Sequence, residues 1–358
     1  MKPTEHLYSL GQSLWLDNIT RDLLTSGTLQ RYIDELSVTG LTSNPTIFDQ
    51  AVTHSGSYDA AIRNLVSGGK SGEALFFELA IDDLTKAADL FAPIHRRTAG
   101  VDGWVSLEVS PLLAHDTART VAEAKALHAK ANRPNLFIKI PGTLEGLPAI
   151  EEAIFSGVPI NVTLLFSRDD YLRAADAYMR GLERRLAAGL SPDIRSVASV
   201  FVSRWDKATL DRVPAALRDR LGVAVSQESY KAYRDLLDSD RWQRLEGRGA
   251  RAQRLLFAST STKDPEASDV LYVASLAAPN TVNTMPEETL LAFANHGQPT
   301  TAMARDGGDA EEVLAAVVRA GVDVSTLAKD LQEQGAKGFV ESWKDLLSAI
   351  EGKSRALA

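Results

Sequence analysis

The chain has 358 residues, of which 44% are hydrophobic and 24% are charged, and its formal net charge is −8. This composition is ordinary for a globular protein with a large core, and an acidic chain without a basic run argues against a nucleic-acid partner. The absence of cysteine excludes disulfides, thiol nucleophiles and cysteine-bound metal centres. No signal-peptide pattern and no run of roughly 20 apolar residues is present, so the sequence predicts a cytoplasmic protein without a membrane partner.

Short apolar runs alternate with longer helical patterns along the chain. We predict strands over 13–17, 37–42, 104–109, 135–140, 159–165, 196–203, 254–260 and 270–275. Short apolar runs of this kind are typical of parallel strands that are covered by helices. Eight strands that alternate with helices predict an α/β fold, a (β/α)₈ TIM barrel, which commonly forms one domain at this length.

Helical patterns fill the connections between these strands. After the third strand, Asp116 can cap a helix whose apolar residues fall on one face. The long connections 45–103 and 204–253 each predict more than one helix. We expect residues 1–358 to form a single domain, in which 309–358 is a C-terminal helical extension packed on the barrel.

Polar side chains interrupt five of the predicted strands near their C-terminal ends. These side chains are Asp17, Asn44, Glu108, Lys139, and Asn161 together with Thr163. In a barrel the C-terminal ends of the strands meet at one face, where enzymes of this architecture carry out their chemistry. The pattern therefore predicts one shared active site.

The lysine among them lies inside one of the most apolar runs of the chain, between Leu136 and Pro141. Burial disfavours the charged form of an amine and makes a free amine available near neutral pH. A free amine can condense with a ketone to form an iminium, which accepts electrons when the adjacent carbon–carbon bond breaks. Nearby carboxylates are needed to move protons during condensation, cleavage and hydrolysis.

Each of these residues also has a purely structural interpretation. Lys139 could extend its amine to solvent from the strand end. Asp17 or Glu108 could be a salt-bridge partner or a helix cap, and Asn161 and Thr163 could form a hydrogen-bonded layer inside the barrel. Packing explains five interrupted strands less well than a shared site does.

At these residues the sequence resembles the transaldolase family, over about residues 13–300 and closest to its longer bacterial branch. The motifs that carry the resemblance are Leu16–Asp17, Thr42–Pro45, Ser106–Val109, Ile138–Pro141 with Glu145–Gly146, Asn161–Ser167 and Ser199–Arg204. Each motif alone is weak, but together, in this order and spacing, they are highly specific. The resemblance implies a class I aldolase-type barrel that needs no cofactor.

The resemblance also implies roles for the catalytic residues. Lys139 matches the Schiff-base lysine on the fourth strand. Asp17 matches the acid or base that takes the proton from the C4 hydroxyl during cleavage. Glu108 and Thr163 match residues that hold a water used in iminium formation and hydrolysis.

A second group matches residues that bind the substrate. Asn44 and Asn161 match positions that hydrogen-bond the substrate and the bound intermediate. Ser199 and Arg204 match part of the phosphate site, where a cation suits the terminal phosphate. Phe201 matches an aromatic residue that faces the active site; related fructose-6-phosphate aldolases carry tyrosine there, so phenylalanine favours transfer over release to water.

The chain departs from the family pattern at the end of the seventh strand, where the family often supplies an arginine to the phosphate. Lys263 stands in this region, and we expect it to bind phosphate as a point charge. The alternative is a solvated loop lysine without a ligand.

The function that the resemblance implies is transfer of a dihydroxyacetone unit between sugar phosphates in the non-oxidative pentose phosphate pathway. The donor is sedoheptulose 7-phosphate, the acceptor is glyceraldehyde 3-phosphate, and the products are erythrose 4-phosphate and fructose 6-phosphate. A fructose-6-phosphate aldolase-type lyase and a non-catalytic sugar-phosphate-binding barrel are the alternatives. The six histidines lack metal-ligand spacing, so we expect no metal and disfavour a metal-dependent hydrolase. The sequence leaves the choice between homodimer and monomer open.

Overall fold

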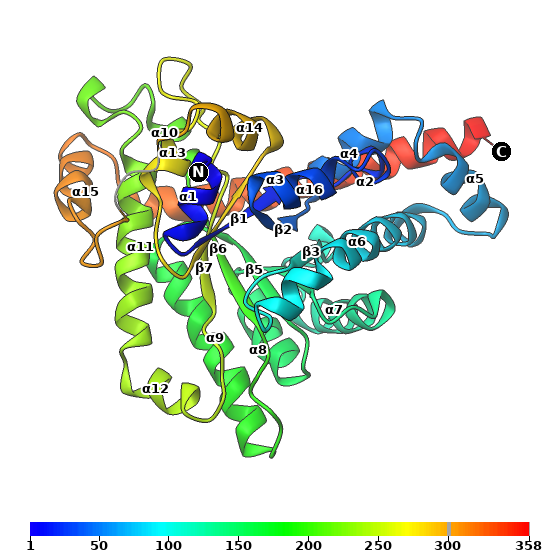
Figure 1. The fold of residues 1–358 in the computed structure, drawn as a ribbon, viewed down its shortest axis with the longest axis horizontal. Helices are drawn as coiled ribbons and strands as arrows, with labels where there is room; N and C mark the ends of the chain where they lie inside the picture. The colour runs from blue at the N-terminus through cyan, green and yellow to red at the C-terminus, as the bar shows by residue number, and fades with distance from the viewer. Residues whose placement is uncertain (299–301, 358) are drawn as a thin grey trace.

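The computed structural model describes residues 1–298 and 302–357. Eight parallel strands form a closed barrel in sequence order, and β1 pairs with β8 to close it (Figure 1). The predicted (β/α)₈ fold class is thereby confirmed. The strands are β1 (Gln12–Asp17), β2 (Val38–Thr42), β3 (Trp104–Glu108), β4 (Leu136–Pro141), β5 (Ile160–Leu165), β6 (Ser196–Phe201), β7 (Arg254–Ala258) and β8 (Thr281–Met285).

One predicted strand is wrong. Residues 270–275 lie in a short helix, α13 (Leu271–Ser275), and the eighth strand is Thr281–Met285. A short apolar run does not distinguish a strand from a buried helical turn, and the true strand carries the polar residues Thr281, Asn283 and Thr284. Neighbouring groups bond to several of these polar atoms: Thr281 Oγ1 donates to a backbone carbonyl at 2.6 Å, and Asn283 Oδ1 accepts from Thr260 at 2.9 Å.

Helices surround the barrel and fill its long connections. From the N-terminus to β4 they are α1 (Pro3–Ser9), α2 (Arg21–Thr25), α3 (Thr28–Leu36), α4 (Pro45–His54), α5 (Asp59–Ser67), α6 (Gly72–Arg97), the 3₁₀ turn η1 (Pro111–Leu113) and α7 (Thr117–Ala131). Between β4 and β7 they are α8 (Gly146–Phe155), α9 (Arg168–Ala187), α10 (Ser203–Thr209), η2 (Ala215–Leu217), α11 (Leu221–Leu237) and α12 (Asp240–Glu246). After β8 follow α14 (Glu287–His296), α15 (Ala310–Arg319) and α16 (Val324–Leu357).

Side-chain caps fix where several of these helices begin. Asp116 accepts a hydrogen bond from the backbone N–H of Arg119 at 3.0 Å, as the sequence predicts for the start of α7. Ser167 and Asp170 form a capping box at the start of α9. The expectation of several helices in each long connection is also correct, because α4, α5 and α6 follow β2 and α10, α11 and α12 follow β6.

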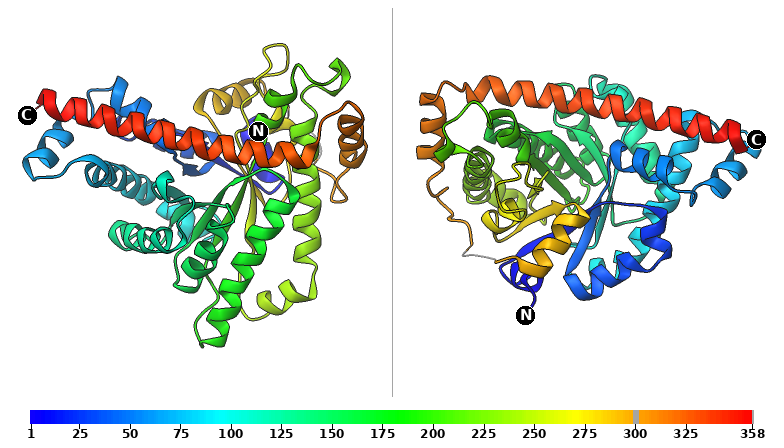
Figure 2. Two further views of the ribbon diagram at one scale, coloured as in Figure 1. Left: turned by 180° about the vertical axis from the view of Figure 1, so that it is seen from behind. Right: turned by 90° about the horizontal axis from the view of Figure 1, so that it is seen from above.

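The last helix, α16, is the longest in the described chain and does not belong to the ring of helices around the barrel. Figure 2 shows it as the long orange-to-red helix that runs from α15 to the side of the molecule where α4 and α5 lie. Thr46 of α4 and Ser342 of α16 place their hydroxyl oxygens 2.7 Å apart, and Lys353 pairs with Asp59 of α5 at 2.7 Å. None of the helices in residues 1–298 and 302–357 has both the length and the apolar character to cross a membrane.

The barrel interior changes from apolar to polar along the strands. Every second strand residue points inward, and toward the N-terminal ends these residues form an apolar plug of Trp15, Trp104, Phe137, Val197, Leu256 and Val282. The Trp104 and Phe137 rings stack with centroids 4.0 Å apart. Gly40 leaves room for this plug, since a Cβ there would lie 2.7 Å from Trp15 Nε1. Closer to the C-terminal ends the interior is polar, so chemistry is confined to that side.

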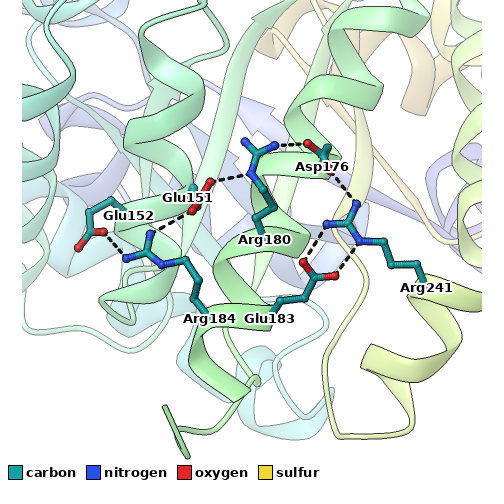
Figure 3. Close-up of polar contacts among 7 residues, drawn as sticks. All are labelled: Glu151, Glu152, Asp176, Arg180, Glu183, Arg184 and Arg241. Atoms are coloured by element: carbon teal, nitrogen blue, oxygen red, sulfur yellow. Dashed lines mark hydrogen bonds and ion pairs between the residues drawn. The ribbon is translucent and has the colours of Figure 1, made fainter. Parts of the chain in front are cut away.

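A surface network of charges connects α8, α9 and α12 on the outside of the barrel (Figure 3). Its members are Glu151, Glu152, Asp176, Arg180, Glu183, Arg184 and Arg241. Arg241 of α12 contacts Asp176 at 2.6 Å and both carboxylate oxygens of Glu183 at 2.7 and 2.9 Å. Arg184 joins α9 to Glu151 and Glu152 of α8 at 3.1 and 2.7 Å. The network holds three outer helices together far from the polar end of the barrel.

Candidate active site

A cavity of about 990 Å³ opens at the C-terminal ends of the strands. Side chains from the ends of most strands line it, together with α4, α14 and one residue of α16. Of the predicted site residues, all but Glu108 and Asn161 line the cavity wall directly, and these two lie in the strands immediately beside Lys139. The structure thus brings the predicted residues together in one place.

Lys139 projects from β4 into this cavity and is only 5% exposed. Its Nζ lies 3.3 Å from Glu108 Oε2 and donates a hydrogen bond to the Ser43 carbonyl at 2.9 Å. The Ser43 carbonyl is available because β2 ends at Thr42 and the chain then turns into α4. A lysine that extended its amine to solvent would not be buried in this way. The amine is instead held inside the barrel next to a carboxylate.

Two carboxyl groups lie near the amine, one on the adjacent strand β3 and one at the end of β1. Glu108 is 6% exposed, and its burial raises its pKa while the adjacent Lys139 opposes the shift. Asp17 faces the cavity at the end of β1, and burial also raises its pKa, against the opposing effects of Lys139 and of a 2.7 Å hydrogen bond from Thr42. A raised pKa brings the protonated form of a carboxyl group closer to neutral pH, so both groups are suited to exchanging protons.

The two polar residues of β5 behave differently from each other. Asn161 is hydrogen-bonded across strands at both ends of its amide: its Nδ2 donates to Ser106 at 3.2 Å and its Oδ1 accepts from Ser199 at 2.7 Å. The hydroxyl of Thr163 is buried in the cavity wall and has no hydrogen-bond partner among the described residues. These two bonds make Asn161 part of a hydrogen-bonded layer, and its substrate-binding role stays a prediction, whereas Thr163 keeps its full hydrogen-bonding capacity for a ligand or a water.

Asn44 has a local structural function as well as a place in the cavity wall. Its Oδ1 accepts a hydrogen bond from the Ile47 N–H at 3.1 Å and caps α4, whose first residue is Pro45. The amide Nδ2 of Asn44 takes no part in this cap. The cap fixes the orientation of the side chain, so the amide is held in place as a hydrogen-bond donor.

The cations in the cavity lie on the side of β6 and β7. Arg204 follows β6 and its guanidinium lies 5.0 Å above the ring centre of Phe201, and burial lowers its pKa. Lys263 is exposed at the rim, where partial burial lowers its pKa, the charge of Glu288 opposes the shift, and the positive charges of Lys207 and Arg204 add to it. Neither cation has an ion pair within the described ranges, in contrast to arginines such as Arg184 and Arg241. Two unpaired cations beside Ser199 can accept an anionic group.

Sequence reasoning missed several residues at this end of the barrel. Thr42 hydrogen-bonds both Asp17 and Thr284, the latter at 2.7 Å, and Ser43 provides the carbonyl that receives the Lys139 amine. Thr42 and Ser43 belong to the motif Thr42–Pro45, so the motif that identified Asn44 could also have identified them. Thr284 could not be found because its strand was misplaced, and Phe339 of α16 lies outside every motif.

Comparison with known proteins places this geometry in a family. A family model described as transaldolase/fructose-6-phosphate aldolase matches residues 14–350. The chain belongs to the transaldolase/fructose-6-phosphate aldolase family. It is 45% identical to a transaldolase from Parafrankia sp. (strain EAN1pec), covering 98% of this chain and 97% of the relative. It is also 45% identical to a transaldolase from Thermobifida fusca (97% of each chain) and 43% identical to transaldolase 2 from Streptomyces coelicolor (97% and 96%).

These comparisons confirm the predicted family, and with it the assignment to the transaldolase class of enzymes. The roles of the individual residues are not part of that finding and stay predictions. No group of three acidic or histidine side chains suited to a metal ion occurs in the ranges that the structure describes.

Proposed function

We propose that the protein transfers a dihydroxyacetone unit from sedoheptulose 7-phosphate to glyceraldehyde 3-phosphate through a Schiff base on Lys139. The observation that carries the proposal is the buried Lys139 amine in the cavity wall, 3.3 Å from Glu108 and close enough to Asp17 to alter its pKa. Neither a salt bridge alone nor a binding protein requires a buried amine that faces a cavity of this size with two carboxyl groups near it.

The first step joins the donor to the enzyme. The neutral Lys139 amine attacks the C2 carbonyl carbon, and the carbinolamine that forms loses its hydroxyl as water to give an iminium. Glu108 can take the proton from the amine and return one to the departing hydroxyl, because it lies within 3.3 Å of the nitrogen. The free hydroxyl of Thr163 can hold the water that leaves and that later returns for hydrolysis.

The second step breaks the bond between C3 and C4. Asp17 as the carboxylate removes the proton of the C4 hydroxyl, erythrose 4-phosphate leaves, and the electron pair of the broken bond passes into the iminium to form an enamine. Thr42 donates a hydrogen bond to Asp17 at 2.7 Å and so orients the carboxylate for this transfer. The enamine then attacks the aldehyde carbon of glyceraldehyde 3-phosphate, Asp17 returns the proton to the new hydroxyl, and hydrolysis releases fructose 6-phosphate.

The far end of each substrate carries the phosphate. Arg204, Lys263 and Ser199 lie on one side of the cavity, and within the described residues neither cation forms an ion pair that would compete with a phosphate. Binding the phosphate there would leave the keto end of the substrate free to extend toward Lys139. Donor and acceptor can use the same phosphate site in turn, because the first aldehyde leaves before the second one binds.

Phe201 favours transfer over release of free dihydroxyacetone. Its side chain is 7% exposed, lines the cavity and lies under the guanidinium of Arg204. A phenylalanine has no hydroxyl with which to orient a water toward the enamine, so the enamine persists until an acceptor aldehyde binds. A fructose-6-phosphate aldolase-type lyase would instead release free dihydroxyacetone.

The proposed function is tested by product analysis with and without an acceptor. With fructose 6-phosphate and erythrose 4-phosphate together, we expect sedoheptulose 7-phosphate and glyceraldehyde 3-phosphate in equal amounts, with Lys139→Ala inactive. Without the acceptor, we expect at most traces of dihydroxyacetone. Stoichiometric release of dihydroxyacetone without an acceptor would favour the lyase instead, and loss of activity on addition of a chelator would favour metal-dependent chemistry.

Three further predictions accompany this function. The cytoplasmic location and the choice between homodimer and monomer remain predictions from the sequence. From the contacts of α16 with α4 and α5, we also propose that residues 1–358 form one domain of which 309–358 is an extension. Limited proteolysis that released 309–358 as a fragment without loss of the folded barrel would argue against a single domain.

A further inference from the structure

The face of α16 that crosses the barrel mouth contacts the residues behind the proposed phosphate site. Gln332, Gly335 and Phe339 follow one another at helical spacing and lie on this face. Phe339 lines the cavity itself, and Gln332 Nε2 donates to the backbone carbonyls of Leu164 at 2.9 Å and of Gly142 at 3.3 Å. The helix is thus bonded to the ends of β4 and β5, next to the catalytic lysine.

The contact with Leu164 involves an unusual backbone conformation. Leu164 has φ of +57°, a left-handed conformation that is rare for a leucine, and the pairing of β5 with β6 shifts between Val162 and Leu165. The carbonyl of Leu164 leaves the regular ladder there and is received by Gln332. This hydrogen bond fixes how closely α16 approaches the strand ends.

The backbone of α16 at Gly335 lies close to Arg204. A Cβ built on Gly335 would lie 2.9 Å from Arg204 Nη1 and 2.9 Å from Leu164 Cδ2, closer than Cβ atoms are found to other heavy atoms. Across the described residues, Arg204 has neither an ion pair nor a hydrogen bond, and its other named contact is the ring of Phe201 at 5.0 Å. The guanidinium is therefore held between the Phe201 ring and the backbone of α16.

We propose that Gly335 is a positioning residue for the phosphate-binding cation: its missing side chain lets Arg204 occupy the place from which the guanidinium reaches the substrate phosphate. The inference rests on the proposed role of Arg204 in binding phosphate. A guanidinium binds phosphate through a fork of fixed geometry, so a displacement of a few tenths of an ångström misaligns its donors. A methyl group at residue 335 forces such a displacement, because Leu164 on its other side is held by its own packing.

The chain offers a matched control on the same helix. Gly338 lies one turn further along α16, and a Cβ built there meets nothing within 4 Å. Gly335→Ala and Gly338→Ala each add one methyl group and each replace a glycine by a better helix former. Any difference between the two variants therefore reports the contact of residue 335 with Arg204 and Leu164.

The experiment measures each variant with and without a phosphate on the ligand. For Gly335→Ala we expect the inhibition constant of inorganic phosphate and the KM for fructose 6-phosphate to rise on the order of tenfold. The yield of the borohydride-reduced adduct of unphosphorylated dihydroxyacetone on Lys139 should not change, and Tm should not fall. Gly338→Ala should match the wild type in the two phosphate-dependent constants and in adduct yield, and its Tm should equal or exceed that of the wild type.

Two results would overturn the inference. Equal phosphate inhibition in the two glycine variants would mean that residue 335 does not position Arg204. A parallel loss of dihydroxyacetone adduct and Tm in Gly335→Ala would mean that the methyl group disturbs the barrel as a whole. Arg204→Ala distinguishes failure of the inference from failure of the proposed function: phosphate inhibition that survives this substitution contradicts the phosphate role of Arg204 itself.

Discussion

Asp206 provides the most quantitative prediction, because its burial has a large effect on its pKa. It lies on α10, two residues after Arg204, and is 3% exposed. Its carboxylate accepts hydrogen bonds from the N–H groups of Leu221 and Gly222 at 3.0 and 3.1 Å and from the Tyr272 hydroxyl at 2.8 Å. Burial outweighs these three donors and raises the pKa of Asp206 from 3.8 to about 6.

The sign of the stability effect follows from this shift. The folded state binds the proton of Asp206 more tightly than the unfolded state, so protonation of Asp206 stabilises the fold. This stabilisation is fully present below pH 3.8 and is lost as the pH rises through about 6. With these two pKa values, the free energy of unfolding falls by about 2 kcal/mol between pH 4.5 and 7.5 because of this group alone. Asp206→Asn cannot titrate and should not show that loss.

The assay is equilibrium unfolding in urea of the wild type and of Asp206→Asn at pH 4.5, 6 and 7.5. The variant is expected to be less stable at low pH, since its amide group cannot accept from all three donors of the carboxylate. Its deficit relative to the wild type should shrink by about 2 kcal/mol as the pH rises, with the change centred between 4 and 6. A difference between the two proteins that stays constant across this range would refute the assigned pKa shift and its cause.

Three substitutions test other parts of the structure. Phe201→Tyr should increase the release of dihydroxyacetone relative to transfer, measured as product ratio at limiting acceptor, and an unchanged ratio would contradict the role of the phenylalanine. Thr163→Val keeps the shape of a buried side chain but removes its hydroxyl, and kcat should fall by about 10²-fold with Tm nearly unchanged. A drop in Tm without a change in kcat would make the residue structural. Arg241→Ala removes the ion pairs of α12 with α9 (Figure 3). It should lower the free energy of unfolding by about 1 kcal/mol at low salt and by less in 1 M NaCl, because its partners are partly exposed. A loss that did not depend on salt would argue for lost packing instead.

Much of the catalytic end of the barrel could be predicted from the sequence for a simple reason. A parallel strand covered by helices is apolar almost throughout, so a polar residue such as Lys139 or Glu108 stands out, and the topology brings all strand ends to one face. The same reasoning failed at β8, where polar residues such as Thr281 and Asn283 alternate with apolar ones and the strand has no apolar run to reveal it. An apolar helical turn, Leu271–Ser275, took its place in the prediction.

Other features depend on tertiary contacts that no local pattern records. The cap formed by Asn44 is a local motif and could be recognised. By contrast, the bonds of Asn161 to neighbouring strands, and the lack of a partner for Thr163 among the described residues, depend on which strands adjoin β5. The contact between Gly335 and Arg204 joins the last helix to the sixth strand end, and a glycine within a helix gives no sign of its neighbour. The motifs stop before this helix, so its place at the cavity emerged only from the structure.

The mechanism is tested most directly by trapping the covalent intermediate. The protein is incubated with fructose 6-phosphate, reduced with borohydride, digested and analysed by mass spectrometry, with Lys139→Ala treated in parallel. A reduced three-carbon adduct on Lys139, absent from the variant, is the result expected from a buried amine 3.3 Å from Glu108 in the cavity wall. Folded protein that turns over the substrate but carries no adduct on Lys139 would contradict the Schiff-base mechanism.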